Sequence, residues 1–270
     1  MAQPSRPTLS EQRDLVRQLR QLGDAATPPD LTADILFATG LADRYFALPS
    51  PLGRIFVAYS QNGVTRVSAP ESVSVFEEDF ARAMKRRVFA IANPPRDLMR
   101  AIERRLRENS RDVAFDLRGL TDFERAVLTK ALEIPYGEVR PYGWIAREIG
   151  HPGAVRAVGT ALGHNPVPLL IPCHRVVRSD GYLGEYSLGG RANKRTMLAA
   201  EGIDPDALEH LARSGIRFYG SDTTHIFCFP TCRHARRVTD AHRVTFPSVA
   251  AAESAGYRPC RVCRPAQAAS

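Results

Sequence analysis

The placement of the five cysteines constrains the fold of this chain more than any other feature. None occurs before Cys173, and the other four form two close pairs near the end, Cys228-x3-Cys232 and Cys260-x2-Cys263, with 27 residues between the pairs. Soft thiolates in two close pairs match the ligand spacing of a tetrahedral zinc site. Two disulfides are the alternative, which a reducing compartment disfavours. We therefore expect a small module that binds Zn²⁺ through these four cysteines, with Cys173 left over as a free thiol.

The 270 residues are enough for two or three structural units. Short apolar stretches predict strands near 44–48, 55–59 and 64–67, and helices near 73–84 and 96–108 follow them. After Thr121 the pattern is mainly helical. We predict an α+β fold that divides into a helical N-terminal extension (1–42), an α/β subdomain (43–118), a helical subdomain (119–203), a connector (204–216), a four-cysteine module (217–266) and a tail (267–270).

The N-terminal extension carries a helical pattern. Leu15, Leu19 and Leu22 would share one face of a helix that Ser10 could cap. We predict that Pro28 and Pro29 end this helix, because proline breaks a helix interior. Nothing in the segment suggests chemistry.

The helical subdomain contains the surroundings of Cys173. A helix that Thr121 or Asp122 can cap is followed by two short helices, the second over 154–163, joined by a glycine-containing turn. Two short helices joined in this way are typical of a helix-turn-helix. A buried strand at 169–171 is then predicted to lead into Cys173.

Charge and hydropathy limit the partners of the chain. The formal net charge is +8 and the pI is about 9.6, with arginine supplying most of the excess, which favours an anionic partner such as nucleic acid. No stretch approaches the roughly 18 consecutive apolar residues of a transmembrane helix, and the first residues lack the apolar run of a signal peptide. We expect a monomer in the cytoplasm, associated with the nucleoid and not with a membrane.

Short motifs lie around Cys173 in the sequence: Ser-Pro-Leu-Gly (50–53), Tyr-Gly-Glu-Val (136–139), Arg-Ala-Val-Gly (156–159), Asn-Pro-Val-Pro-Leu-Leu-Ile-Pro-Cys-His-Arg-Val-Val (165–177) and Glu-Gly (201–202). Over about residues 44–203 these motifs resemble the O6-alkylguanine-DNA alkyltransferase family. The resemblance implies a ribonuclease-H-like α/β subdomain and a helix-turn-helix subdomain that holds the active site. It also implies that the partner is double-stranded DNA containing alkylated guanine.

The resemblance assigns catalytic roles to five residues. Cys173 would accept the alkyl group, His174 would act as its general base through a water, and Glu201 would orient His174. Asn165 would help to hold the water network, and Tyr142 would donate a hydrogen bond to the departing O6 atom. This Cys, His, Glu order resembles a hydrolase triad used for alkyl transfer.

Further residues match the family's DNA contacts and base pocket. Arg156 matches the arginine that fills the gap when the base leaves the stack. The other expected DNA contacts are Ala157, Gly159 and Arg175. The expected pocket residues are Pro168, Leu183, Tyr186 and Lys194.

The residue types agree with this chemistry. An ordinary cysteine pKa of about 8.5 leaves little thiolate at neutral pH, so displacement of an alkyl group needs a base beside the sulfur. The product is a thioether, and the sequence shows no cofactor motif that could regenerate the thiol. We therefore expect one irreversible transfer per chain. The resemblance implies that the alkyl group comes from O6-alkylguanine and also from O4-alkylthymine, the reaction of a methylated-DNA–protein-cysteine S-methyltransferase.

The four-cysteine module resembles the zinc module of Ada-type repair proteins, through Thr-Thr-His-Ile-Phe-Cys-Phe-Pro-Thr-Cys-Arg (223–233) and Ala-Gly-Tyr-Arg-Pro-Cys (255–260). The family's second methyl acceptor, which takes a methyl group from methylphosphotriesters, matches Cys228. Zinc-bound thiolates keep a local negative charge, so such a sulfur stays nucleophilic without a base. His225 and Phe229 stand where glycine and arginine are common in the family, so a zinc module that only helps to hold DNA stays open.

Two other functions also stay open. A methylation-responsive regulator of transcription would need a second base-reading element, which the sequence does not show. A non-catalytic binder of alkylated lesions would share the fold, but such proteins carry tryptophan at the position of Cys173. The cysteine favours an alkyltransferase.

Overall fold

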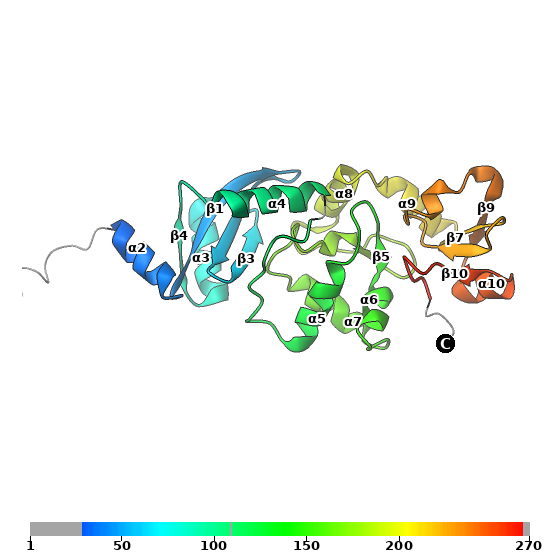
Figure 1. Cartoon of the computed structure of the whole chain (residues 1–270), viewed down its shortest axis with the longest axis horizontal. Helices are drawn as coiled ribbons and strands as arrows, with labels where there is room; N and C mark the ends of the chain where they lie inside the picture. Colours follow the sequence, from blue (N-terminus) through cyan, green and yellow to red (C-terminus); the bar gives the residue numbers. More distant parts are fainter. Residues whose placement is uncertain (1–28, 109, 267–270) are drawn as a thin grey trace, which may run out of the picture.

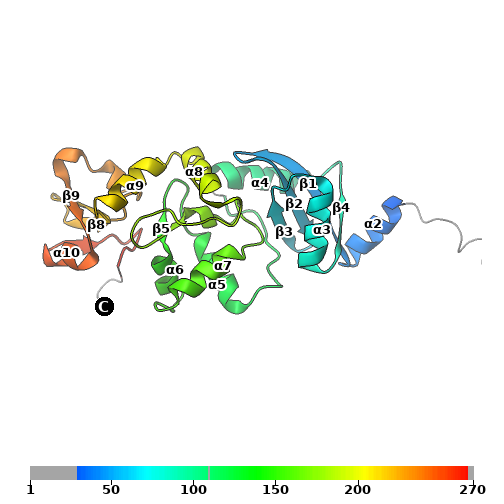
Figure 2. The same cartoon turned by 180° about the vertical axis from the view of Figure 1, so that it is seen from behind.

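The computed structural model describes residues 29–108 and 110–266, which form three units in a row (Figure 1). A sheet unit, a mostly helical unit and a small C-terminal unit follow one another in sequence order, and the view from behind shows the same order (Figure 2). Within the described ranges, no helix is both long and apolar enough to cross a membrane. The predicted helix through Leu15, Leu19 and Leu22, capped by Ser10, lies outside the described residues.

The first unit is a four-stranded sheet of order β3-β2-β1-β4, in which β4 runs parallel to β1 and the other pairs are antiparallel. Helix α2 precedes the sheet and begins at Pro29. The earlier helix that Pro28 and Pro29 are predicted to end lies outside the described residues. Strand β4 was not predicted from the sequence. The elements are α2 (Pro29–Ala38), β1 (Ala42–Ser50), β2 (Gly53–Ser60), β3 (Gly63–Ser68), α3 (Val73–Met84), β4 (Arg87–Ala90) and α4 (Arg96–Glu108).

Side chains alternate between the two faces of this sheet, and each face packs against a helix. Tyr45 and Phe56 point to one face and pack with Phe76 of α3. Their neighbours in the strands, among them Ile55, point to the other face and share a core with Ile102 of α4. The sheet is therefore buried on both sides.

The middle unit holds Cys173 in a short 3₁₀ helix between helices. Thr121, one of the two predicted caps, caps the first helix in a capping box with Glu124. The predicted strand at 169–171 is wrong: these residues are buried, but Leu169 has a φ of 71° and only an isolated bridge joins Pro168 to Ile171. The elements are α5 (Asp122–Ala131), β5 (Arg140–Pro141), α6 (Tyr142–Glu148), α7 (Val155–Gly163), η1 (Cys173–Arg175), β6 (Val176–Val177) and α8 (Gly190–Ala200).

Two contacts fix the first unit against the segment that carries Cys173. The Val67 backbone N–H of β3 donates to the Pro166 carbonyl oxygen at 2.9 Å. Buried Arg105 of α4 donates from Nε to the Leu170 carbonyl oxygen at 2.8 Å. The sheet unit thus supports the loop before Cys173 from behind.

The C-terminal unit follows helix α9 (Pro205–Arg213), the predicted connector, and is built on a sheet of order β10-β8-β7-β9. Its elements are β7 (Phe218–Ser221), β8 (Ile226–Cys228), η2 (Ala235–Arg237), η3 (Asp240–His242), β9 (Arg243–Phe246), α10 (Val249–Ser254) and β10 (Arg258–Pro259). One cluster of buried side chains runs without interruption from the middle unit into this sheet.

Candidate active site and metal centre

Cys173 begins the 3₁₀ helix η1 and is 5% exposed. It lies at a cavity of about 200 Å³ that Tyr142, Gly159 and Ser187 also line. The cavity therefore opens between the thiol, helix α6 and helix α7.

Asn165, two residues after the end of α7, contacts the thiol. Its Nδ2 donates to Cys173 Sγ at 3.2 Å and to the Ile171 carbonyl oxygen at 3.1 Å. Burial raises the pKa of the Cys173 thiol, although the Asn165 hydrogen bond opposes this shift. The sulfur is thus held as a thiol that needs a base before it can attack.

His174 and Glu201 form a buried pair directly behind the thiol. Glu201 Oε1 lies 2.7 Å from His174 Nε2. Nδ1 of the same ring is buried and has no hydrogen-bond partner among the described residues. Burial lowers the pKa of His174, although Glu201 opposes this shift, so the ring is held neutral with Nδ1 able to accept a proton.

Glu201 is ionised although burial disfavours its charge. The hydrogen bond to His174, together with the charge and hydrogen bonds of Arg175, outweighs burial and holds the pKa of Glu201 at about 2. Its Oε2 also accepts a hydrogen bond from the Gly137 backbone N–H at 3.1 Å. This carboxylate therefore has a fixed position and charge.

The expectation that Arg175 contacts DNA is corrected by its position. The side chain is 2% exposed, and its Nε donates to both oxygens of Glu201, at 3.0 and 2.9 Å. Its Nη1 donates to the Ile134 carbonyl oxygen at 2.7 Å. A guanidinium bound in this way faces the protein interior and not a phosphate.

The four expected pocket residues divide into two groups. Tyr186 lines the cavity beside Cys173, and its ring contacts His174 edge to face. Pro168, Leu183 and Lys194 are buried but do not line this cavity. Lys194 Nζ donates to the Val176 carbonyl oxygen at 2.5 Å, and burial lowers its pKa to about 8.

Helix α7 presents the expected DNA contacts. Arg156 and Ala157 are exposed in its first turn, and Gly159 lines the cavity over the thiol. A Cβ at Gly159 would lie 3.9 Å from the Tyr142 ring, so the helix passes close to that ring.

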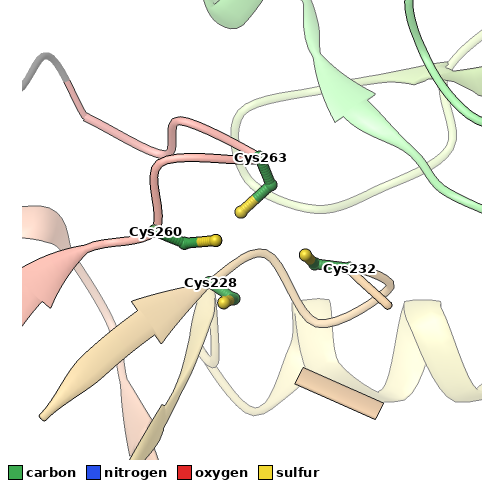
Figure 3. Close-up of side chains that lie close together, drawn as sticks. All are labelled: Cys228, Cys232, Cys260 and Cys263. Atoms are coloured by element: carbon green, nitrogen blue, oxygen red, sulfur yellow. The ribbon is translucent and has the colours of Figure 1, made fainter. Parts of the chain in front are cut away.

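The four remaining cysteines converge as the spacing predicts (Figure 3). Their Sγ atoms all lie within 4.8 Å of one another, and all four residues are buried. A Zn–S bond of about 2.3 Å gives tetrahedral sulfur separations of roughly 3.8 Å. The cluster thus fits a zinc ion with four thiolate ligands.

A second cavity, of about 550 Å³, lies beside this cluster. Cys228 and Cys260 line it together with Arg237, Arg258 and Arg261. Phe229 is buried against the middle unit and is not part of this cavity.

His225, the other departure from the family pattern, has a φ of 52° in the left-handed region that favours glycine. Its ring lies 5.0 Å from that of Tyr257. Histidine is among the non-glycine residues that adopt this region more often than others.

Four further residues contribute to the site without having been predicted from the sequence. Ser187 Oγ lies 3.8 Å from Cys173 Sγ, and only its position after Tyr186 hints at this. Gly137 and Glu138 belong to a motif quoted above, but no role was inferred for them. Arg140 was not singled out, although its buried side chain forms an ion pair with Glu138.

Comparisons with known protein families agree with both parts of this description. Residues 122–203 match the family model of the DNA-binding domain of 6-O-methylguanine DNA methyltransferase, and residues 211–266 match that of the metal-binding domain of Ada.

Individual relatives point to the same family. The methylated-DNA–protein-cysteine methyltransferase of Mycobacterium tuberculosis is 54% identical over 90 residues, which are 33% of this chain and 53% of the relative. That of Mus musculus is 56% identical over 82 residues, 30% of this chain and 39% of the relative. The chain thus spans about half the length, or less, of these curated relatives.

A solved structure is matched more completely. A variant of Mycobacterium tuberculosis OGT is 35% identical with a TM-score of 0.50, over 59% of this chain and 92% of that chain. With the matching family models and this relative covered over nearly its whole length, the chain belongs to the 6-O-methylguanine DNA methyltransferase family and carries an Ada-type metal-binding module after the methyltransferase part.

Proposed function

We propose that this protein repairs double-stranded DNA by transferring the alkyl group of O6-alkylguanine to Cys173, once per chain. The observation that carries the proposal is the buried Cys173 thiol, which opens on a cavity and is followed directly by the His174–Glu201 pair. The names of the relatives support the same class of reaction.

In the proposed reaction a bond forms between Cys173 Sγ and the alkyl carbon, and the bond between that carbon and O6 breaks. The thiol proton passes through a water to His174 Nδ1, and the departing guanine takes up one proton in turn. Burial raises the pKa of Tyr142, so its hydroxyl stays protonated and can donate to O6. Glu201 stabilises the His174 cation that forms in between.

A base inside a duplex cannot reach a buried thiol, so the guanine has to leave the stack. Exposed Arg156 lies at the start of α7, whose later residue Gly159 lines the cavity. We propose that α6 and α7 act as a helix-turn-helix and that Arg156 fills the space that the base leaves.

The test is mass spectrometry of the protein after incubation with duplex DNA that contains a single O6-methylguanine. We expect one methyl group on the peptide that contains Cys173, at most one per chain, and none on a Cys173→Ser variant. A duplex with O4-methylthymine tests the second substrate. Methylation of another residue in the Cys173→Ser variant at the rate of the unaltered protein would refute the assignment.

A second acceptor function is supported by the cavity beside Cys228, because its three arginines can hold the phosphates that flank a neutral methylphosphotriester. We propose that Cys228 takes the methyl group from such a phosphate. DNA carrying methylphosphotriesters should then methylate Cys228 in a Cys173→Ser protein that retains its zinc. If zinc is bound normally and Cys228 is never methylated, the module has only a structural or DNA-holding role.

A further inference from the structure

The C-terminal unit packs against the backbone segment that supports the catalytic carboxylate. Thr231 Oγ1 accepts a hydrogen bond from the Val139 backbone N–H at 2.9 Å, and the Arg233 backbone N–H donates to Glu138 Oε1 at 3.0 Å. These two residues flank Cys232, one of the four clustered cysteines. The loop that carries one cysteine pair thus holds residues 138 and 139 directly.

Arg236 adds Gly137 to the residues that the C-terminal unit contacts. It lies in η2, and its backbone N–H donates to the Cys232 carbonyl oxygen at 3.0 Å. Its Nη2 donates to the Gly137 carbonyl oxygen at 3.1 Å. Arg236 is an exposed residue, so loss of its side chain should leave the fold of the module intact.

The loop after the second cysteine pair docks on helix α6. Arg264 follows Cys263, and its guanidinium lies 2.8 Å from Glu148 Oε2. The Arg264 carbonyl oxygen accepts from Arg147 Nη2 at 3.0 Å. Both cysteine-bearing loops therefore contact the unit that contains Cys173.

A buried ion pair of the middle unit lies at the centre of this contact. Glu138 is 1% exposed and pairs with Arg140, which is 2% exposed. The Arg140 guanidinium lies 5.3 Å from the ring centroid of Phe229, next to Cys228. Separation of the units would remove the Arg233 hydrogen bond and the Phe229 ring from this buried pair, which is costly, so the contact favours one arrangement of the units.

Gly137 connects the contact to the catalytic residues. Its N–H donates to Glu201 Oε2 at 3.1 Å, and Glu201 Oε1 lies 2.7 Å from His174 Nε2. A Cβ at Gly137 would lie 3.1 Å from the Glu201 carbonyl oxygen and 3.6 Å from Arg236 Nη2. Gly137 is thus held between the C-terminal unit on one side and the catalytic carboxylate on the other.

We propose that the metal-loaded C-terminal module positions the Glu201–His174 pair for alkyl transfer, through the loop 231–236 and the backbone of residues 137–139, with Arg236 as a positioning residue. The inference rests on the proposed function of Cys173. A unit this small depends on its metal for a fixed conformation, so the loop is rigid only when the four cysteines hold zinc. Loss of zinc should then loosen the support of a carboxylate that contacts no zinc ligand.

The experiment uses the full chain and three variants, Arg236→Ala, Arg236→Lys and Thr231→Val, with Arg213→Ala as the control. Arg213 is an exposed arginine of α9, so its removal changes the net charge equally without touching the contact. The first readout is hydrogen exchange of the Gly137 and Val139 amides. The second is the rate, between pH 5 and 8, at which free O6-benzylguanine alkylates Cys173, which avoids any effect on DNA binding.

We expect faster amide exchange and a fall in rate of about 3- to 10-fold for Arg236→Ala and Thr231→Val, with zinc content unchanged, partial rescue in Arg236→Lys and no change in Arg213→Ala. Removal of zinc by a chelator should reproduce these effects, and the two losses should not add, because both act through the same contact. The acid limb of the rate should also move, because a misplaced Glu201 supports the His174 cation less well.

The inference is overturned if zinc-free protein and Arg236→Ala keep the exchange rates and pH profile of the zinc-loaded chain. Failure of the proposed function has a different signature: zinc-loaded protein would not react at Cys173 with any O6-alkylguanine. In that case the amide exchange alone still decides whether the module fixes residues 137–139.

Discussion

At the scale of single residues, Glu201 combines a structural and a chemical role. Its carboxylate accepts hydrogen bonds from His174, Arg175 and the Gly137 backbone, and it stays ionised with a pKa of about 2. A carboxyl group whose pKa is lower in the folded than in the unfolded protein stabilises the fold above its unfolded pKa, near 4.5 for Glu201. That stabilisation is lost as the pH falls through about 2.

We therefore predict that Glu201→Gln lowers the free energy of unfolding by about 3 kcal/mol at pH 7, because Arg175 is left buried without its counter-charge. The deficit should be the same at pH 5 and should shrink below pH 4. Urea unfolding at these pH values measures it, with exposed Glu103→Gln on α4 as the control. A deficit that is unchanged at pH 3 would show that the charge of Glu201 is not its source.

His174 leads to a prediction about rate and not about stability. Because burial lowers its pKa, the ring should remain a neutral base below the ordinary histidine range. The rate of Cys173 alkylation by a free O6-alkylguanine base should stay nearly constant from pH 8 to 6.5 and fall only at lower pH. A rate that rises about tenfold per pH unit between 6 and 8 would instead indicate attack by free thiolate without a base.

At the scale of elements, helical periodicity predicts the bounds of helices better than a short apolar run predicts a strand. Helices α3 (Val73–Met84) and α4 (Arg96–Glu108) have the predicted bounds because each has an apolar face of helical period. The apolar run at 169–171 predicts a strand, but the left-handed φ of Leu169 turns the backbone there, which an apolar pattern cannot reveal. Strand β4 was missed because it is four residues long and mostly not buried.

Some parts of the candidate site could be predicted from the sequence and others could not. The metal cluster follows from cysteine spacing alone, since its ligands lie in two short loops. The direction of the Arg175 side chain does not follow from sequence, because an arginine next to a catalytic motif can equally face a phosphate or a carboxylate. The contact between Glu138 and Arg233 joins residues 95 positions apart, and no local pattern marks it.

The proposed role of helix α7 in base extrusion can be tested at Arg156. Arg156→Ala should slow repair of O6-methylguanine in duplex DNA by roughly 10- to 100-fold, because extrusion of the base loses its support. The rate with the free base should change by less than about twofold, since no base has to leave a stack. Arg213→Ala removes the same charge elsewhere and controls for lost attraction to phosphates. Equal losses on both substrates would make Arg156 an ordinary part of the helix.

At the scale of the whole molecule, the buried core of the middle unit continues into the C-terminal sheet, so the units are not independent in stability. Cys232→Ala should abolish tight zinc binding, unfold the module and lower the thermal midpoint of the remaining protein by several degrees, roughly 2–4 °C per kcal/mol of lost contact. Calorimetry together with zinc analysis measures both effects, and Cys173→Ala, which keeps all four ligands, is the control. An unchanged midpoint in the zinc-free variant would show that the shared core contributes nothing to the middle unit.

The hold of residues 231–236 on residues 137–139 has a consequence for the order in which the protein matures on the ribosome. Cys173, His174 and Glu201 are all synthesised before the loop that supports them. Protein synthesis adds about 5–20 residues per second, so a few seconds pass between the synthesis of Glu201 and that of the loop. During this time the catalytic residues lack the contacts that support them. A nascent chain would thus reach full reactivity only after its last cysteine has been made and zinc has been captured. Metal supply during translation would then set how quickly new molecules become competent.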